Sequence, residues 1–266
     1  MKILMAGPRG FCAGVDRAID TVERALAVVG APLYVKHEII HNKPVCESLK
    51  ARGVVFTDDL TDVPVGSLVV FSAHGSAPAD YAVAESRSLQ ILDATCPLVT
   101  KIHLEVRKYL KKGFGVVYIG HHGHVETIGT LGQAPGQLHL VTNLEEVAAL
   151  ADPGNDALIY LTQTTLSIDE TRGIVDALKA MFSRLQDPPS SDICYATQNR
   201  QEAIKEIARQ ADLVIVVGSR NSSNSVRLVE VALEYGAKAS YLVDYAEEIQ
   251  DEWFMGVETI GLTSGA

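Results

Sequence analysis

The stretch Leu213-Val-Ile-Val-Val-Gly-Ser-Arg-Asn-Ser-Ser-Asn-Ser225 indicates the fold class of this chain. Its first five residues form an apolar run without alternation, which is typical of a strand buried on both faces of a parallel sheet. The polar loop after this run opens a helical pattern that Gly236 ends, and a second apolar run, Ala239–Val243, comes next. A strand, a helix and another strand in this order predict an α/β architecture.

The same alternation continues along the whole chain. The apolar runs that predict strands are Lys2–Met5, Leu33–Ile40, Leu68–Ser72, Gln90–Asp93, Val116–Ile119, Gln137–Val141, Ala157–Leu161, Leu213–Val217, Ala239–Val243 and Glu258–Leu262. Helical patterns lie between them, and Pro44 and Pro97 suit the first turns of two helices. A further helix opens with the capping box Ser167-Ile-Asp-Glu170, and its apolar positions are predicted to continue to Leu185.

Composition excludes several classes of protein. A formal net charge of -10 disfavours nucleic acid and anionic membranes as partners. No apolar stretch reaches the roughly 18 residues that a membrane-spanning helix needs, and the N-terminal apolar run is too short for a signal peptide. Four cysteines in 266 residues are too few for a disulfide scaffold, so we expect a cytoplasmic protein with reduced thiols.

Most of the unusual polar side chains directly follow a predicted strand. They are Cys12, His41, His74, Cys96, His121, His122, His124, Glu126, Thr162–Thr165 and Ser222–Asn224. The carboxyl ends of parallel strands meet at one edge of a sheet, and ligands bind there. The sequence therefore predicts a polar cavity that is rich in thiols and imidazoles.

Three cysteines admit two interpretations. Thiolates at Cys12, Cys96 and Cys194 would hold an iron–sulfur cluster or a zinc ion and leave one position open to substrate. Their spacing matches no local Cys-x-x-Cys pattern, and spacing alone favours inert buried thiols. The two glycines that flank Cys12 favour the cluster, because they let the backbone approach it closely. Cys46 is expected to be an ordinary core residue of a short helix.

Two polar loops also remain open to alternatives. The run from His121 through His122 and His124 to Glu126 is typical of a zinc or dinuclear-metal hydrolase, and equally of a solvated polar loop. In a closed pocket the pKa of Glu126 would rise, and its carboxyl could deliver protons. The loop Ser219–Ser225 suits a phosphate at a helix N-terminus, or simple capping of that helix. A non-enzymatic α/β protein that binds a phosphorylated metabolite is a third hypothesis.

Taken together, eight ordered segments resemble the 4-hydroxy-3-methylbut-2-enyl diphosphate reductase family. The segments are Gly7-Pro-Arg-Gly-Phe-Cys-Ala-Gly14, His41-Asn-Lys43, Ala73-His-Gly75, Asp93-Ala-Thr-Cys-Pro97, Gly123-His124 with Glu126, Thr162-Gln-Thr-Thr165, Asp192-Ile-Cys-Tyr-Ala-Thr-Gln-Asn-Arg-Gln201 and Gly218-Ser-Arg-Asn-Ser-Ser-Asn-Ser225. The resemblance implies a trefoil of three similar α/β domains with mostly parallel sheets around a central cavity. The implied domains are residues 14–96, 97–193 and 194–266, with residues 1–13 joining the third.

The resemblance also implies an oxidoreductase with a 4Fe–4S cluster, one per chain, on Cys12, Cys96 and Cys194. The implied substrate-binding residues are His41, His74, His124, Thr164, Thr165, Ser222, Ser223 and Asn224. Glu126 and Thr164 would be catalytic, handling protons and orienting the allylic hydroxyl. The implied reaction converts (E)-4-hydroxy-3-methylbut-2-enyl diphosphate to isopentenyl and dimethylallyl diphosphate, with ferredoxin or flavodoxin as electron donor. A monomer and a homodimer both remain open.

Two differences from the family pattern stand out. Family members often read His-Pro-Glu with a second acid two residues later, whereas Val125 and Ile128 occupy those places here and Glu126 is kept. The resemblance further implies that the family continues after Ala266 with a serine that contacts diphosphate, followed by a helix and a tail.

Overall fold

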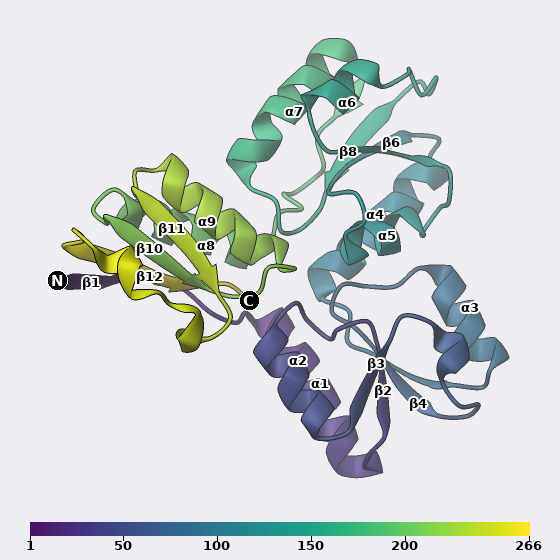
Figure 1. The fold of residues 1–266 in the computed structure, drawn as a ribbon. Coiled ribbons are helices and arrows are strands. Elements are labelled where there is room, and N and C mark those ends of the chain that lie inside the picture. The colour runs from purple at the N-terminus through teal and green to yellow at the C-terminus, as the bar shows by residue number, and fades with distance from the viewer. The chain divides into compact units, whose positions relative to one another are not determined.

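Parallel pairing joins the strands of this chain into three four-stranded sheets, seen in a computed structural model that describes residues 1–266 (Figure 1). The first sheet has the order β1 (Lys2–Met5), β12 (Thr259–Ser264), β10 (Leu213–Val217), β11 (Ala239–Val243). The second has the order β3 (Val54–Thr57), β2 (Leu33–Lys36), β4 (Leu68–Phe71), β5 (Gln90–Asp93). The third has the order β7 (Leu138–Val141), β6 (Gly115–Ile119), β8 (Leu158–Thr162), β9 (Leu185–Gln186). The α/β prediction with parallel sheets is confirmed.

Helices connect the strands, as parallel pairing requires. The α-helices are α1 (Ala13–Val29), α2 (Lys43–Ala51), α3 (Pro78–Ser86), α4 (Pro97–Lys111), α5 (Val125–Leu131), α6 (Leu144–Ala149), α7 (Ile168–Met181), α8 (Tyr195–Ala208) and α9 (Ser223–Glu234). Three short 3₁₀ turns are η1 (Leu60–Asp62), η2 (Ala246–Glu248) and η3 (Asp251–Phe254). None of the helices is long and apolar enough to cross a membrane.

The chain divides into two compact units. Unit 1 contains residues 1–16, 40–53 and 195–266, and unit 2 contains residues 17–39 and 54–194. The first sheet belongs to unit 1, and the other two sheets belong to unit 2. The N-terminal strand β1 pairs with β12 near the other end of the sequence, from Lys2 opposite Thr259 to Met5 opposite Leu262. The three-domain division at residues 96 and 193 stays a prediction.

The strand β10 shows why its sequence lacks alternation. Val214 and Val216 pack in the same core as side chains from α8 and α9, including Ile204 and Leu228. The intervening residues Leu213 and Ile215 belong to a second core, which Trp253 and Phe254 border. Both faces of this strand are therefore covered, so an apolar residue is favoured at every position.

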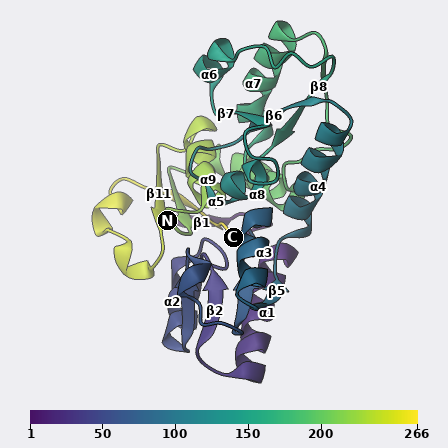
Figure 2. The same ribbon diagram turned by 90° about the vertical axis from the view of Figure 1, so that its right-hand side faces the viewer.

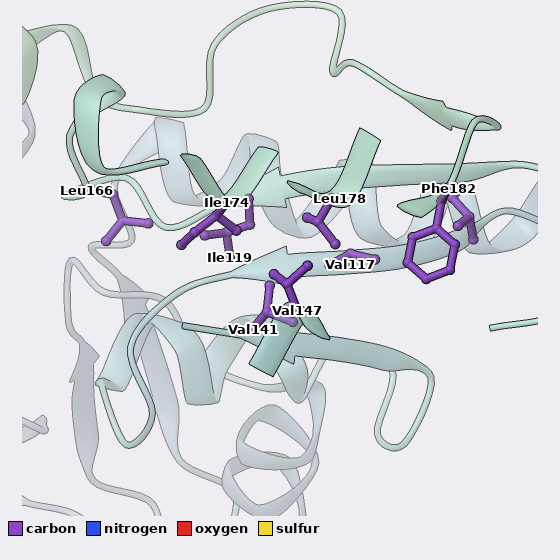
Figure 3. Packing of buried hydrophobic residues seen from close by; sticks show 9 residues of the cluster. Val117, Ile119, Val141, Val147, Leu166, Ile174, Leu178 and Phe182 are labelled. Carbon is purple, nitrogen blue, oxygen red and sulfur yellow. The ribbon is translucent and has the colours of Figure 1, made fainter. Parts of the chain in front are cut away.

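The third sheet is likewise covered on both faces (Figure 2). Figure 3 shows Val117 and Ile119 of β6 packed with Ile174 and Leu178 of α7. The alternate β6 residue Tyr118 packs in a separate core that contains Ile102 and Val106 of α4. Each buried aliphatic side chain of this kind contributes about 1.5–3 kcal/mol to the stability of the fold. This packing fixes β6 and β8 side by side, and the loops that follow them carry much of the candidate site.

Local signals for the ends of helices are confirmed. Pro44 lies in the first turn of α2, after Asn42, whose side chain accepts a hydrogen bond from the Val45 amide. The Ser167 side chain caps α7 by accepting from the Glu170 amide at 2.9 Å. Gly236 follows α9 with φ of +119°, a conformation that glycine adopts without a steric penalty.

Three details of the predicted elements are wrong. The strand predicted over Leu33–Ile40 ends at Lys36, because His37 turns the backbone with φ of 59°. The helix predicted to continue to Leu185 ends at Met181, and Leu185 pairs with Leu158 in β9. Extended chain brings Phe182 and Leu185 to the same core, so their spacing resembles a helical face. The strands β3 and β9 were not predicted; β9, with two residues, is too short to show any periodicity.

Candidate active site

A buried carboxyl group lies at the carboxyl end of the third sheet, in unit 2. Glu126 is in the first turn of α5 and is 2% exposed. One carboxylate oxygen accepts a hydrogen bond from the Thr164 amide at 2.7 Å, and the other accepts from the Thr164 hydroxyl at 2.8 Å. Thr164 follows β8, and Glu126 follows the neighbouring strand β6. The predicted pairing of these two residues at adjacent strand ends is therefore present.

Burial sets the protonation of this carboxyl group. Desolvation raises the pKa of Glu126 to about 7, even though the two hydrogen bonds from Thr164 favour the charged form. The negative charge of Asp192 adds to the rise in pKa. A carboxyl group with a pKa near neutrality can both hold and release a proton under physiological conditions. The geometry therefore suits general acid–base chemistry at Glu126.

A buried ion pair supports the strand end that carries Thr164. Asp192 accepts a hydrogen bond from the Thr162 amide at 3.0 Å, and its other oxygen lies 2.8 Å from Nζ of Lys101. Two residues later, the Cys194 amide donates to the Thr164 carbonyl oxygen at 2.8 Å. The segment 192–194 thus fixes both Thr164 and Cys194. Sequence reasoning assigned no function to Lys101 or Asp192, although Asp192 belongs to a segment that carries the family resemblance.

Two predicted substrate-binding histidines also come together in unit 2. The ring centroids of His74 and His124 are 6.2 Å apart, with an interplanar angle of 83°. His124 is the N-cap of α5, and His74 follows β4 in the second sheet. The close approach of Gly129 to Gly75 holds these two loops together, since a Cβ atom on Gly129 would lie 2.7 Å from the Gly75 carbonyl oxygen. Thr165 lies beside Thr164, and its hydroxyl accepts from Nε2 of Gln163 at 2.9 Å.

In unit 1, the loop between β10 and α9 gathers the other predicted substrate-binding residues; residues 218–225 are called the anion loop below. Ser222 is the N-cap of α9, and its hydroxyl oxygen accepts from both the amide and the hydroxyl of Ser225. Ser223 and Asn224 begin the helix. Nδ1 of His41 lies 3.4 Å from Nδ2 of Asn221 in the same loop. A helix N-terminus with hydroxyl and amide groups favours an anion.

The Asn224 side chain gives the clearest sign of a ligand in this loop. It is 4% exposed, and neither its amide nitrogen nor its amide oxygen has a hydrogen-bond partner. An unpaired buried polar group costs about 1–3 kcal/mol. A phosphate oxygen at the helix N-terminus would supply the missing acceptor for the amide nitrogen. The structure shows the helix capping, by Ser222, and ligand binding by this loop stays a prediction, which the unpartnered Asn224 amide supports.

Three cysteines share one local setting, and the fourth differs. Cys12, Cys96 and Cys194 are half-buried and form no disulfide, and each directly precedes a helix: α1, α4 and α8 respectively. Cys46 instead lies inside α2, is 1% exposed, and its thiol contacts the Ile40 carbonyl oxygen at 3.4 Å. The prediction that Cys46 is a core residue is confirmed. Cys12 belongs to unit 1 and the other two belong to unit 2, so their shared ligation of one cluster stays a prediction.

The hydrolase hypothesis is not favoured by this structure. Nε2 of His122 lies 3.0 Å from an exposed carboxylate, that of Glu146, whereas Glu126 is bonded to Thr164. His121 uses its backbone amide to bond Oε1 of Gln163. Within unit 2, no group of three or more His, Cys, Asp and Glu side chains is arranged to hold a metal ion.

Comparison with known proteins identifies the family. A family model described as "LytB protein" matches residues 3–266. The chain belongs to the LytB family. A relative from Mycobacterium ulcerans (strain Agy99) is 56% identical over 265 residues, which cover 100% of this chain and 80% of the relative. A relative from Nocardia farcinica (strain IFM 10152) is 57% identical over 265 residues, covering 100% of this chain and 79% of the relative. Both family members are named 4-hydroxy-3-methylbut-2-enyl diphosphate reductase.

A solved structure shows the same fold. The E-1-hydroxy-2-methyl-but-2-enyl-4-diphosphate reductase from Plasmodium falciparum matches this LytB family member with a TM-score of 0.97 and 43% sequence identity. The match covers 100% of this chain and 83% of that chain. The family resemblance stated from the eight sequence segments is thereby confirmed.

Proposed function

We propose that this chain is a 4-hydroxy-3-methylbut-2-enyl diphosphate reductase. It would remove the allylic hydroxyl of (E)-4-hydroxy-3-methylbut-2-enyl diphosphate and form isopentenyl and dimethylallyl diphosphate. The observation that carries the proposal is the buried Glu126 carboxyl, bonded through both oxygens to Thr164 and poised to titrate near neutral pH. The names of the relatives, at 56–57% identity, support the same reaction.

The cofactor of this proposal is one 4Fe–4S cluster held by Cys12, Cys96 and Cys194. The donor set fits such a cluster, because thiolates are ligands that iron–sulfur clusters prefer, and three cysteines outside any disulfide each directly precede a helix. When bound, the cluster would supply the electrons and an open iron site for the hydroxyl oxygen. Ferredoxin or flavodoxin would deliver these electrons, in the reducing cytoplasm expected from the sequence.

The first role of the protein's own residues in the reaction would be to supply a proton. Loss of the hydroxyl group as water requires a proton at its oxygen, and Glu126 holds one near pH 7. The Thr164 hydroxyl lies 2.8 Å from the carboxylate and would orient the substrate hydroxyl while passing the proton on. The Thr164 carbonyl oxygen also accepts a hydrogen bond from the Cys194 amide. This bond would help to hold the Thr164 hydroxyl, the group that passes the proton on, in one position.

Binding of the diphosphate group would fall to both units. In unit 1, we assign this role to His41, Ser222, Ser223 and Asn224, which lie at or near the N-terminus of α9. In unit 2, we assign it to His74 and His124, with Thr165 in a supporting role beside Thr164. Backbone amides, hydroxyls and imidazoles are all groups that bind phosphate oxygens.

An anaerobic assay tests the proposed function. Reconstituted chain is supplied with a chemical reductant and the hydroxylated allylic diphosphate, and the products are separated by chromatography. The proposal predicts both five-carbon diphosphates, with formation dependent on iron and sulfide. Release of free phosphate without reductant would instead indicate a hydrolase. Tight binding of the substrate without turnover, unaffected by removing iron, would indicate a non-enzymatic binding protein.

A further inference from the structure

A second polar cavity of about 370 Å³ lies in unit 2, outside the candidate active site. We call it the Arg107 pocket. Its lining includes Tyr81 of α3, Asp93 and Thr95 after β5, and His103 and Arg107 of α4. None of these residues has an assigned role in the proposed reaction, although the pocket adjoins the candidate site: Thr95 precedes Cys96, and a Cβ atom on Gly75 would lie 2.7 Å from Cε1 of His103.

The pocket holds one guanidinium group without a bonded partner, that of Arg107, and one carboxylate, that of Asp93. Arg107 makes no hydrogen bond or ion pair with another residue. The carboxylate in the lining, Asp93, is already occupied, because one oxygen accepts from the Thr95 amide at 2.9 Å and the other from the Tyr81 hydroxyl at 2.7 Å. An unpaired guanidinium group presents two parallel N–H donors, the geometry that a carboxylate accepts.

Buried polar atoms in the lining also lack partners. His103 is 6% exposed, and its Nε2 atom has no hydrogen-bond partner. The same holds for the hydroxyl of Thr95, which is 7% exposed. Burial, together with the nearby Arg107 cation, lowers the pKa of His103 to about 4, so its ring is neutral at pH 7. Such groups are usually satisfied in proteins, and an absent ligand is one physical reason for the exception.

We propose that the Arg107 pocket binds a small organic carboxylate. Arg107 would pair with the two oxygens of the ligand, while the faces of Tyr81 and Pro78 offer an apolar wall for its carbon skeleton. The lining holds one cation, Arg107, and one carboxylate, Asp93, so a ligand carboxylate adds a single further negative charge, which its two hydrogen bonds to Arg107 offset. A phosphate dianion would bring a second charge close to Asp93 with no further cation in the lining.

Titration of the full chain with benzoate, acetate and inorganic phosphate at constant ionic strength tests this proposal. Calorimetry at pH 7 is expected to show saturable benzoate binding with a Kd of about 1 mM or tighter. The His103 ring resonances in NMR spectra are expected to shift as the site fills. The Arg107→Gln variant is expected to weaken binding at least about tenfold, since the bidentate pair is lost. Lys111→Gln, which removes the same charge from the end of α4, is the matched control and should bind like the wild type.

Three outcomes would overturn the proposal. One is the absence of saturation by either carboxylate at concentrations well above the millimolar range. Another is equal binding by the Arg107→Gln and Lys111→Gln variants, which would indicate a general charge effect. The third is tighter binding of phosphate than of both carboxylates, which would assign the pocket to a different ligand class. These readouts do not use turnover, so they are independent of the proposed reductase activity.

Discussion

Two regions of the molecule differ in how their buried polar groups are hydrogen-bonded. These are the loop region around Glu126 in unit 2 and the anion loop in unit 1. Both oxygens of Glu126 accept hydrogen bonds from Thr164, although the carboxyl is almost fully buried. Asn224 is equally buried, yet neither atom of its amide has a partner. The first region satisfies its buried polar group within the chain, and the second does not. The proposed proton-transfer role of Glu126 and the proposed binding role of Asn224 rest on this difference.

The largest effect is expected for Glu126→Gln, which keeps the shape of the side chain and removes its proton chemistry. We expect kcat to fall about 100- to 1,000-fold, the usual contribution of a general acid, while KM changes little. Anaerobic steady-state kinetics with the allylic diphosphate measure both constants. Glu146→Gln, at an exposed carboxyl of the same unit, serves as the control and should retain turnover. A large rise in KM at unchanged kcat would assign Glu126 to binding instead.

The pH dependence of stability provides a second, slightly smaller effect. The pKa of Glu126 is about 7 in the folded chain against 4.5 for an ordinary glutamate. Between these values the folded state binds more protons than the unfolded state, so the free energy of unfolding falls as pH rises. By the time the pH exceeds 7, the ionisation of Glu126 has lowered the free energy of unfolding by about 3 kcal/mol in total. Urea unfolding at pH 5 and pH 8 tests this as a difference between two proteins: from pH 5 to pH 8 the wild type should lose about 2–3 kcal/mol relative to Glu126→Gln, because other groups that titrate in this range, such as His103, are common to both. Parallel pH curves for the two proteins would refute the assignment.

Asn224→Ala should give the reverse pattern of effects on the enzyme. Loss of the amide is expected to raise KM about 10- to 100-fold, because hydrogen bonds to a charged ligand contribute about 1.5–3 kcal/mol, and to leave kcat nearly unchanged. The free protein should lose little stability, since the deleted amide had no partner. Gln210→Ala, an exposed amide side chain just after α8 in the same unit, is the control. A fall in kcat without a change in KM would place Asn224 in the chemical step.

The smallest effect is expected for Ser222→Ala in the same loop. Its hydroxyl caps α9, so the substitution should lower the free energy of unfolding by about 1 kcal/mol even without ligand. Thermal unfolding of the free protein compares it with Asn224→Ala. If Asn224→Ala proved the more destabilising of the two, the Asn224 amide would have a structural role, and the contrast between satisfied and unsatisfied groups would fail.

Sequence patterns predicted most of the strands, both the well-buried β10 and the largely exposed β1 and β5. Strands such as β10 have apolar residues at every position, and the polar residues that follow them were located from that pattern alone. Short elements such as β9 were not predicted, because two residues show no hydrophobic periodicity. Contacts between residues far apart in the sequence were not predicted either. Lys101 and Asp192 are separated by 91 positions, and only the packing of the fold brings them together. The roles of the cysteines came from the family resemblance, since their spacing alone favoured inert thiols.

The central claim is that Cys12, Cys96 and Cys194 hold one cluster, whereas Cys46 belongs to the core. Iron and acid-labile sulfide analysis of anaerobically purified protein tests it most directly. We predict about four irons and four sulfides per wild-type chain, a large loss in each serine variant of the three ligands, and full retention in Cys46→Ser. Wild-type protein without iron and sulfide after anaerobic reconstitution, or a cluster that survives in the three serine variants, would contradict the account.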